Sequence, residues 1–338
     1  AALTSLSAAQ TYSNCNPLYT TGCPADSALG RSVSIDFTKG ASDSFTPSGN
    51  PTYNGDGVAF TVAKSGDSPQ ITSKWYIMFG RVEVLLKAAP GVGIVSSVVL
   101  QSDSLDEIDW EWLGADADKV QSNYFGKGQT TTYNRGAFHA DSGSQSGYKR
   151  YTIDWTANQI LWQIDGVTVR SLTPSTAEAG QYPQTPMQVK IGAWSGGDAS
   201  NSAGTITWAG GATNYAAGPY SMYVKSVSVQ DYSTGTQYSY KGTSGTWQDI
   251  SAAGGSVNSG GSKVVDNAPA VTSVSSGQPI VFQGTHRDTT SYTTPSVYPW
   301  VPQATTLSTA TYANYPGLPS GWTVSSSGKV VPPSSASV

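Results

Sequence analysis

The sequence is short of charge, cysteine, histidine and long apolar runs, and each shortage argues against a class of protein. Only 12% of the 338 residues are charged, the net charge is -4, and no basic block is present. Nucleic acid and anionic membrane surfaces are therefore not expected partners. No segment approaches the roughly 18 consecutive apolar residues of a membrane-spanning helix, so no transmembrane segment is predicted.

Cysteine and histidine are too few to suggest a metal centre. The chain has two cysteines, Cys15 and Cys23, and two histidines, His139 and His286. These residues do not offer enough ligands at suitable spacing, so we expect no metal and no other cofactor. The segment CNPLYTTGC allows a small closed loop. We interpret the pair as a disulfide formed in an oxidising compartment, with two free buried thiols as the alternative.

Glycine, serine, threonine, tyrosine and tryptophan are abundant, whereas the residues that favour long helices are sparse. Between residues 30 and 245, segments of strand length alternate apolar and polar side chains and are separated by turn residues. They are RSVSIDF, GVAFTVAK, FGRVEVLLKA, IVSSVVLQS, EIDWEWLG, YKRYTIDWT, QILWQIDGVTVRSL, MQVKIGAWS, TITWAGG and MYVKSVSVQDY. This pattern predicts an all-β sandwich or barrel, with one short helical candidate at 175–182.

The composition changes near residue 250, where serine, threonine, glycine, proline and valine dominate. Such a segment buries too little apolar area to offset backbone ordering, which costs about 1–2 kcal/mol per residue. We predict one folded domain at residues 1–248 and a disordered, O-glycosylated linker or stalk at 249–338. A folded second module is the alternative, supported by Trp300, Tyr312, Tyr315 and Trp322.

Against this charge-poor background, SLDEIDWEWLGAD at 104–116 holds four acidic residues within six positions. On a strand, Glu107, Asp109 and Glu111 share one face, and Asp106 belongs to the preceding turn. The opposite face carries Ile108, Trp110 and Trp112. Neighbouring carboxylates repel one another and suit strands poorly, so we expect a functional reason for the acidic face.

Glycoside cleavage is the chemistry that this spacing favours. Residues i and i+4 of a strand are about 13 Å apart at Cα, so the carboxyls of Glu107 and Glu111 can lean to within about 5–6 Å. Retaining glycosidases have about 5–5.5 Å between their carboxyls and inverting ones about 6.5–9.5 Å. One glutamate would attack the anomeric carbon while the other serves as acid and then base, with Asp109 separating their pKa values. A calcium site and a plain acidic edge strand are the alternatives.

The surplus of aromatic residues suits a sugar substrate, because the apolar faces of pyranose rings pack on tryptophan and tyrosine. The segment QSNYFGKG follows the acidic strand and supplies Asn123 and Tyr124, and GAWSGGD supplies Trp194 beside a glycine pair. Each of these aromatic residues, taken alone, fits the core better than it fits a sugar-binding surface.

These motifs carry a resemblance to a known family. DEIDWEWLG resembles the E-x-D-x-E signature of glycoside hydrolase family 16 in the form without an extra residue before the last glutamate. YTIDWTANQILWQIDG, PMQVKIGAWSGGD and GPYSMYVKSVSVQDY resemble later strands of that family in the same order. CNPLYTTGCPADSALG, VQSNYFGKGQTTTYNRG and PQTPMQVKIGAWSGGDASNSAGTITWAGG resemble the fungal Crh cell-wall transglycosylases over residues 12–248.

The resemblance implies a β-jelly-roll sandwich of two antiparallel sheets with a concave sugar cleft. It implies retaining cleavage of chitin and transfer of the chain to a β-glucan or chitin acceptor. Glu107 would be the nucleophile, Asp109 its helper and Glu111 the acid/base. The weaker, substrate-binding candidates are Gln101, Asn123, Tyr124, Trp194 and Trp208.

We expect a secreted monomer that works at the cell wall, with two departures from the family pattern. No cysteines are present for a chitin-binding module, and the ending PPSSASV is not a hydrophobic anchor signal, so glycolipid anchoring of a precursor stays open. Transfer rather than hydrolysis depends on a cleft that excludes water. An endo-hydrolase of β-glucan or chitin on the same fold and a non-catalytic wall-binding lectin are therefore competing hypotheses.

Overall fold

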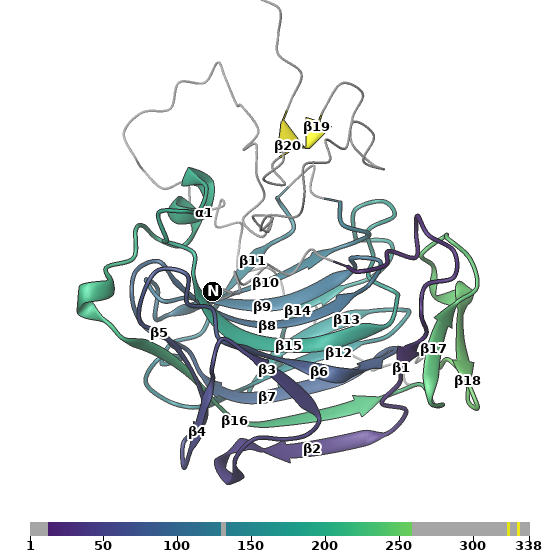
Figure 1. Ribbon diagram of the computed structural model, residues 1–338, viewed down its shortest axis with the longest axis horizontal. Coiled ribbons are helices and arrows are strands. Elements are labelled where there is room, and N and C mark those ends of the chain that lie inside the picture. Colours follow the sequence, from purple (N-terminus) through teal and green to yellow (C-terminus); the bar gives the residue numbers. More distant parts are fainter. Residues whose placement is uncertain (1–12, 130–132, 259–322, 325–329, 332–338) are drawn as a thin grey trace, which may run out of the picture.

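Two large antiparallel sheets form the body of the protein in the computed structural model, and they stack as two layers (Figure 1). The structure describes residues 13–129, 133–258, 323–324 and 330–331. The all-β, two-sheet prediction is confirmed. The first sheet has seven strands, in spatial order β11 (Ala137–Ala140), β10 (Lys119–Phe125), β9 (Glu107–Leu113), β8 (Ile94–Ser102), β15 (Met187–Ser195), β6 (Gln70–Ile77) and β3 (Phe45–Ser48).

The second sheet lies against one face of the first, and two small sheets are also present. Its strands are β14 (Val167–Leu172), β13 (Ile160–Ile164), β12 (Lys149–Trp155), β7 (Gly80–Lys87), β16 (Tyr220–Asp231), β5 (Gly57–Val62) and β4 (Thr52–Asn54), with β2 (Ser32–Asp36) on β16. The small sheets are formed by β1 (Asp26–Ser27), β17 (Gln237–Tyr240) and β18 (Ile250–Ala253), and by β19 (Thr323–Val324) and β20 (Val330–Val331).

The core between the two large sheets is rich in tryptophan. Trp110, Trp112, Trp155 and Trp162 are fully buried there among aliphatic side chains from both sheets. The buried indole N–H groups have acceptors: Trp162 Nε1 donates to the Asp109 carbonyl at 3.0 Å. The packing therefore buries large apolar areas without leaving these donors unsatisfied.

Two local predictions are wrong. Residues 175–182 form turns rather than a helix, and TITWAGG is not a strand. Its first residues belong instead to α1 (Ala203–Trp208), in which the Ser202 side chain accepts from the Thr205 backbone N–H as an N-cap. The cap favours the helical turn, and no strand in the described part of the chain pairs with this segment. Short 3-10 helices lie at Phe37–Lys39, Tyr215–Ala217 and Trp247–Asp249.

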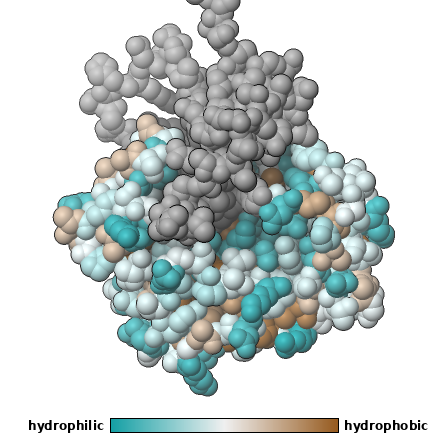
Figure 2. All heavy atoms as spheres, in the orientation of Figure 1, coloured by the Kyte–Doolittle hydropathy of each residue, from teal (hydrophilic) through white to brown (hydrophobic). Residues whose placement is uncertain are grey.

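The folded part continues past residue 248, because β18 pairs with β17. The predicted disordered stalk falls almost entirely outside the described residues. No helix among the described residues is long and apolar enough to cross a membrane. On the face shown in Figure 2, the described residues are mostly hydrophilic to neutral in colour, and strongly hydrophobic areas are small.

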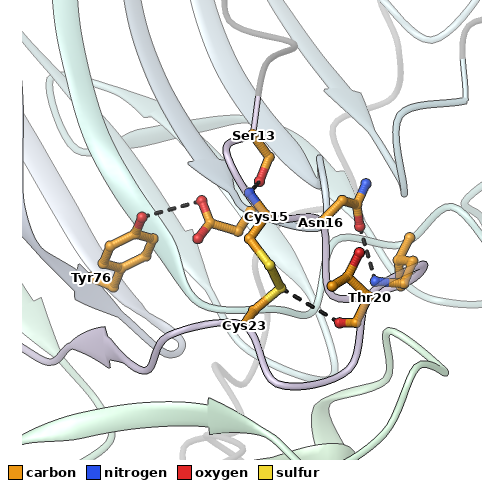
Figure 3. The surroundings of a disulfide bond; sticks show 8 residues. Ser13, Cys15, Asn16, Thr20, Cys23 and Tyr76 are labelled. Atoms are coloured by element: carbon orange, nitrogen blue, oxygen red, sulfur yellow. Dashed lines mark hydrogen bonds between the residues drawn. A yellow bond between two sulfur atoms is a disulfide. The ribbon is translucent and has the colours of Figure 1, made fainter. Parts of the chain in front are cut away.

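The disulfide between Cys15 and Cys23 is present, as predicted (Figure 3). It closes a loop in which Asn16 accepts hydrogen bonds from the backbone of Leu18, Tyr19 and Thr20. Tyr76, on β6, lies beside this loop and donates to the Asp103 carboxylate at 3.2 Å. Part of the disulfide loop and the turn between β8 and β9 line the same pocket.

Candidate active site

Strand β9 runs unbroken between β8 and β10, and its side chains alternate as the sequence predicts. Glu107 lies opposite Gln101, Asp109 opposite Val99, and Glu111 opposite Ser97, with no shift in register. Residues directly opposite one another in a sheet share a face. Because Ile108, Trp110 and Trp112 pack in the core, the three acidic side chains point to the other face of the sheet. We call this surface the acidic face.

Asp106, the fourth acidic residue, lies just before β9 and fixes the start of the strand. Its carboxylate accepts hydrogen bonds from Lys127 N and Gln184 N, each at 2.9 Å, and from Thr185 Oγ1 at 2.7 Å. The preceding residue, Leu105, has a positive φ of 64°. The buried carboxylate of Asp106 is saturated by structural contacts, which separates it from the three residues of the acidic face.

Glu107 is buried, which raises its pKa, but its polar and cationic neighbours favour the ionised carboxylate. Burial raises its pKa to about 7, while hydrogen bonds from Asp109 and Gln101 and the charges of Lys190 and Arg135 oppose that rise. The Gln101 amide donates to Glu107 Oε2 at 3.1 Å. Glu107 therefore has several groups that stabilise its negative charge.

Glu111 has the opposite environment. Burial raises its pKa well above the ordinary value, and the charges of Asp109 and Glu107 raise it further. Glu111 Oε1 has no hydrogen-bond partner among the described residues. The pKa of Asp109 is also raised, by burial and then by Glu107, although Arg170 and the Asn123 N–H counteract this rise. The first glutamate is thus favoured as the carboxylate and the last as the acid.

An aromatic pair lies on the acidic face beyond Glu111. Trp194 on β15 is opposite Val95 on β8, which is opposite Leu113 at the end of β9, so these residues share the face. Trp208 of α1 stacks on Trp194, with ring centroids 6.2 Å apart and planes 23° from parallel. The two half-buried indoles offer a flat apolar surface of the kind that a pyranose ring packs on.

Strand β10 divides the two remaining candidates between its faces. Asn123 lies opposite Asp109 and belongs to the acidic face. Tyr124 lies opposite Ile108, and it is buried in the core with its hydroxyl accepting from Glu178 N at 3.1 Å. Because side chains alternate along a strand, adjacent residues such as these cannot lie on the same face. The structure does not bring Tyr124 to the site, so we withdraw it as a sugar-binding candidate.

A pocket with a volume of about 490 Å³ adjoins the Glu107 end of the acidic face. Its lining includes Gln101, Lys190, Asp26, Asp103 and Tyr76, together with part of the disulfide loop. Lys190 was not predicted from the sequence, although it lies four residues before Trp194 in MQVKIGAWS and therefore on the same face of the strand. Asp26 and Asp103 gave no local signal, because residues far apart in the chain bring them together.

Asp26 and Asp103 behave as a coupled acidic pair in this pocket. Burial first, and then the neighbouring Asp103, raise the pKa of Asp26 to about 8. The Asp103 pKa is also raised by burial, against the effects of Tyr76 and Lys190. Among the described residues, no group of three or more His, Cys, Asp or Glu side chains is arranged to hold a metal ion.

Comparison with known proteins identifies the family of this chain. Residues 39–210 match the model of glycosyl hydrolases family 16. Crh-like protein 4 of Aspergillus fumigatus is 58% identical over 334 residues, covering 97% of this chain and 74% of that protein. Crh-like protein 4 of Botryotinia fuckeliana is 54% identical over 335 residues, covering 98% and 88%.

A solved structure also matches. A Crh5 transglycosylase in complex with NAG is 49% identical, with a TM-score of 0.69 over 70% of this chain and 99% of that one. The chain belongs to glycosyl hydrolases family 16, and within it to the Crh-like proteins. It is accordingly an enzyme of the glycosidase and transglycosylase class, and the sequence-based family and fold predictions are confirmed.

Proposed function

We propose that this protein is a retaining cell-wall transglycosylase that cleaves chitin and transfers the chain to a β-glucan or chitin acceptor. The names of its relatives support the activity: a Crh5 transglycosylase, solved also with NAG, and Crh-like proteins of two fungi. The observation that carries the proposal is the contrast between the two glutamates. Glu107 accepts a hydrogen bond from Gln101, and its neighbours oppose the rise in its pKa. Glu111 Oε1 has no hydrogen-bond partner among the described residues, and its acidic neighbours raise its pKa further.

In the proposed first half-reaction, the Glu107 carboxylate attacks the anomeric carbon and forms a covalent glycosyl-enzyme. Glu111 gives its proton to the leaving glycosidic oxygen, so the departing chain leaves as a neutral alcohol. Asp109 hydrogen-bonds to Glu107, which holds the nucleophile in place and spreads its charge. Glu111 must act first as an acid and then as a base, so its pKa has to fall between the two steps. It falls because Glu107, whose charge raises the Glu111 pKa, loses that charge when it becomes the ester.

In the second half-reaction, the ionised Glu111 removes the proton from an acceptor hydroxyl as that oxygen attacks the glycosyl-enzyme. The nucleophile Glu107 leaves as a carboxylate, and the anomeric configuration is retained after two inversions. A sugar acceptor gives transfer, whereas water gives hydrolysis. Acceptor packing on an apolar surface such as Trp194 and Trp208 would exclude water and favour transfer.

Substrate contacts are proposed for the groups that share the acidic face. Gln101 and the pocket lie at the Glu107 end, Asn123 lies beside Asp109, and the Trp194–Trp208 pair lies beyond Glu111. We further propose that the protein is secreted, acts as a monomer at the cell wall, and carries its chemistry in residues 1–248 together with β18. A stalk role for the rest of the chain remains part of this proposal.

The proposal is tested with chitin oligosaccharides as donors and a fluorescent β-glucan oligosaccharide as acceptor. We expect labelled hybrid products from the wild type and none from Glu107→Gln. New reducing ends without labelled hybrids would instead establish an endo-hydrolase. A wild type as inert as Glu107→Gln, with both proteins still binding chitin, would establish a lectin.

A further inference from the structure

A chain of two hydrogen bonds links a lysine on β15 to the proposed nucleophile on β9. Lys190 Nζ donates to Gln101 Oε1 at 2.6 Å. Gln101 Nε2 in turn donates to Glu107 Oε2 at 3.1 Å. The three residues lie on three neighbouring strands of the first sheet, β15, β8 and β9, and all three side chains are on the acidic face.

The lysine determines which end of the Gln101 amide faces Glu107. An ammonium group only donates hydrogen bonds, so it requires the carbonyl oxygen of the amide. The NH₂ group is then left for the carboxylate. A reversed amide would place NH₂ against the ammonium group and the carbonyl against the Glu107 carboxylate, and both contacts would be repulsive. With the lysine in place, Gln101 can serve Glu107 only as a donor.

Lys190 is itself held between acidic groups. Burial lowers the pKa of its ammonium group, and the charges of Glu107 and Asp103 counteract this. Asp103 is fixed by the Tyr76 hydroxyl, so the lysine has an anchored counter-charge on the pocket side. Lys74 lines the same pocket but is exposed, and no hydrogen bond joins its side chain to Gln101 in the described part of the chain.

We propose that Lys190 is a positioning residue for the nucleophile: it orients the Gln101 amide and supplies the cation that keeps Glu107 in its ionised, attacking form. This inference rests on the proposed role of Glu107 as nucleophile. Lys190 does not need to touch the reacting atoms, because it acts through Gln101 and through its charge.

The expected pH effect follows from the groups around Glu107. Asp109 and Glu111 face it from its own strand, Arg135 from the segment before β11, and Lys190 from β15, with Asp103 behind the lysine. The Glu107 pKa is already raised to about 7 by burial. Removing a nearby cation raises it further, so a smaller fraction of the nucleophile is ionised at acidic and neutral pH.

The experiment compares Lys190→Met, Lys190→Arg and Lys74→Met in the full chain. The pH profile of kcat/KM is measured with chitin oligosaccharide donors. We expect the acidic limb of Lys190→Met to move up by about one pH unit, which lowers the rate below that limb by about tenfold. Lys190→Arg should restore most of the loss, and Lys74→Met should leave the acidic limb at the wild-type pH, because Lys74 does not act on the Glu107 pKa. Gln101→Met, which removes the donor, should shift the limb in the same direction.

A second readout does not depend on turnover. Carboxyl carbon NMR of selectively labelled protein, with Glu107→Gln used to assign the signal, gives the titration of Glu107 directly. We expect a higher midpoint in Lys190→Met than in the wild type, at unchanged circular dichroism. Equal midpoints in both proteins would overturn this inference whatever the activity. A wild type that turns over no glycan would overturn the proposed function alone. Should Lys190→Met not fold, Lys190→Arg and Gln101→Met decide the question by the same titration.

Discussion

Gln101 and Glu107 lie directly opposite one another on adjacent strands, and the Gln101 amide nitrogen is 3.1 Å from Glu107 Oε2. Glu111, further along the same strand, is opposite Ser97, whose hydroxyl has no hydrogen-bond partner among the described residues. Two glutamates on one face of one strand therefore meet different cross-strand neighbours. This difference is the physical basis for assigning them different roles.

Replacing Glu111 with glutamine should stabilise the protein while it abolishes turnover. The folded-state pKa of Glu111 is raised by burial, so the folded protein binds a proton that the unfolded chain releases, and stability falls as pH rises above the unfolded pKa. Glutamine removes this dependence. We expect Glu111→Gln to unfold at a higher temperature at neutral pH, by about 2–4 °C for each kcal/mol gained.

The check is thermal unfolding of both proteins over a series of pH values. The difference should shrink toward acidic pH, where the wild-type carboxyl is protonated in both states. An advantage that is the same at every pH would show that Glu111 is not destabilised by its own ionisation.

The wild type should lose stability as pH rises from the ordinary carboxyl pKa to about pH 8, and Asp26→Asn should remove this loss. The pKa of Asp26 is raised to about 8 by burial and then by Asp103. The folded state therefore binds more protons than the unfolded state in this window, and wild-type stability declines as pH rises through it. The variant should be the more stable protein near pH 8, measured by chemical denaturation.

Asp36→Asn provides a control of opposite sign. Its pKa is lowered, chiefly by hydrogen bonds from Thr38, so the charged form stabilises the fold above the unfolded pKa and this contribution is lost in acid. If Asp26→Asn and Asp36→Asn changed stability with the same pH trend, the interpretation of Asp26 would be wrong.

Trp194→Ala should weaken binding of the sugar chain more than it slows the chemical step. The indole forms one half of the stacked pair with Trp208, and its loss removes apolar area from the acidic face. We expect KM to rise by about tenfold, or about 1.4 kcal/mol, with a smaller change in kcat. Steady-state kinetics over a range of donor concentrations separates the two parameters.

Tyr124→Phe is the matched aromatic control. This side chain packs in the core, and its hydroxyl accepts a hydrogen bond from the Glu178 backbone N–H. KM should stay at the wild-type value even where thermal stability falls. A rise in KM for Tyr124→Phe equal to that of Trp194→Ala would return Tyr124 to the substrate site.

Sequence reasoning succeeded where one strand carries its own signal. Alternation alone placed Glu107, Asp109 and Glu111 on one face, and it gave the bounds of β8 and β15 as the structure has them. It failed where another segment decides the outcome. The face on which Tyr124 lies depends on the register of β10 against β9. The Lys190–Gln101 contact depends on pairing between strands that are far apart in the chain.

At α1 the Ser202 cap favours a helix, and the alternating pattern of this segment meets no partner strand among the described residues. The acidic pair in the pocket could not have been found from the sequence, since Asp26 follows the disulfide loop and Asp103 lies in the turn before β9. The coupling of their protons exists only once the fold has buried both.

The most direct test of the central claim is to trap the glycosyl-enzyme. Glu111→Gln is incubated with a chitin oligosaccharide bearing an activated leaving group, so that the first step needs no acid catalyst and the second lacks its base. The account predicts a protein whose mass increases by the donor sugar, with the adduct mapped by peptide mass spectrometry to Glu107. An adduct on Asp109, or product of inverted configuration without any adduct, would contradict it.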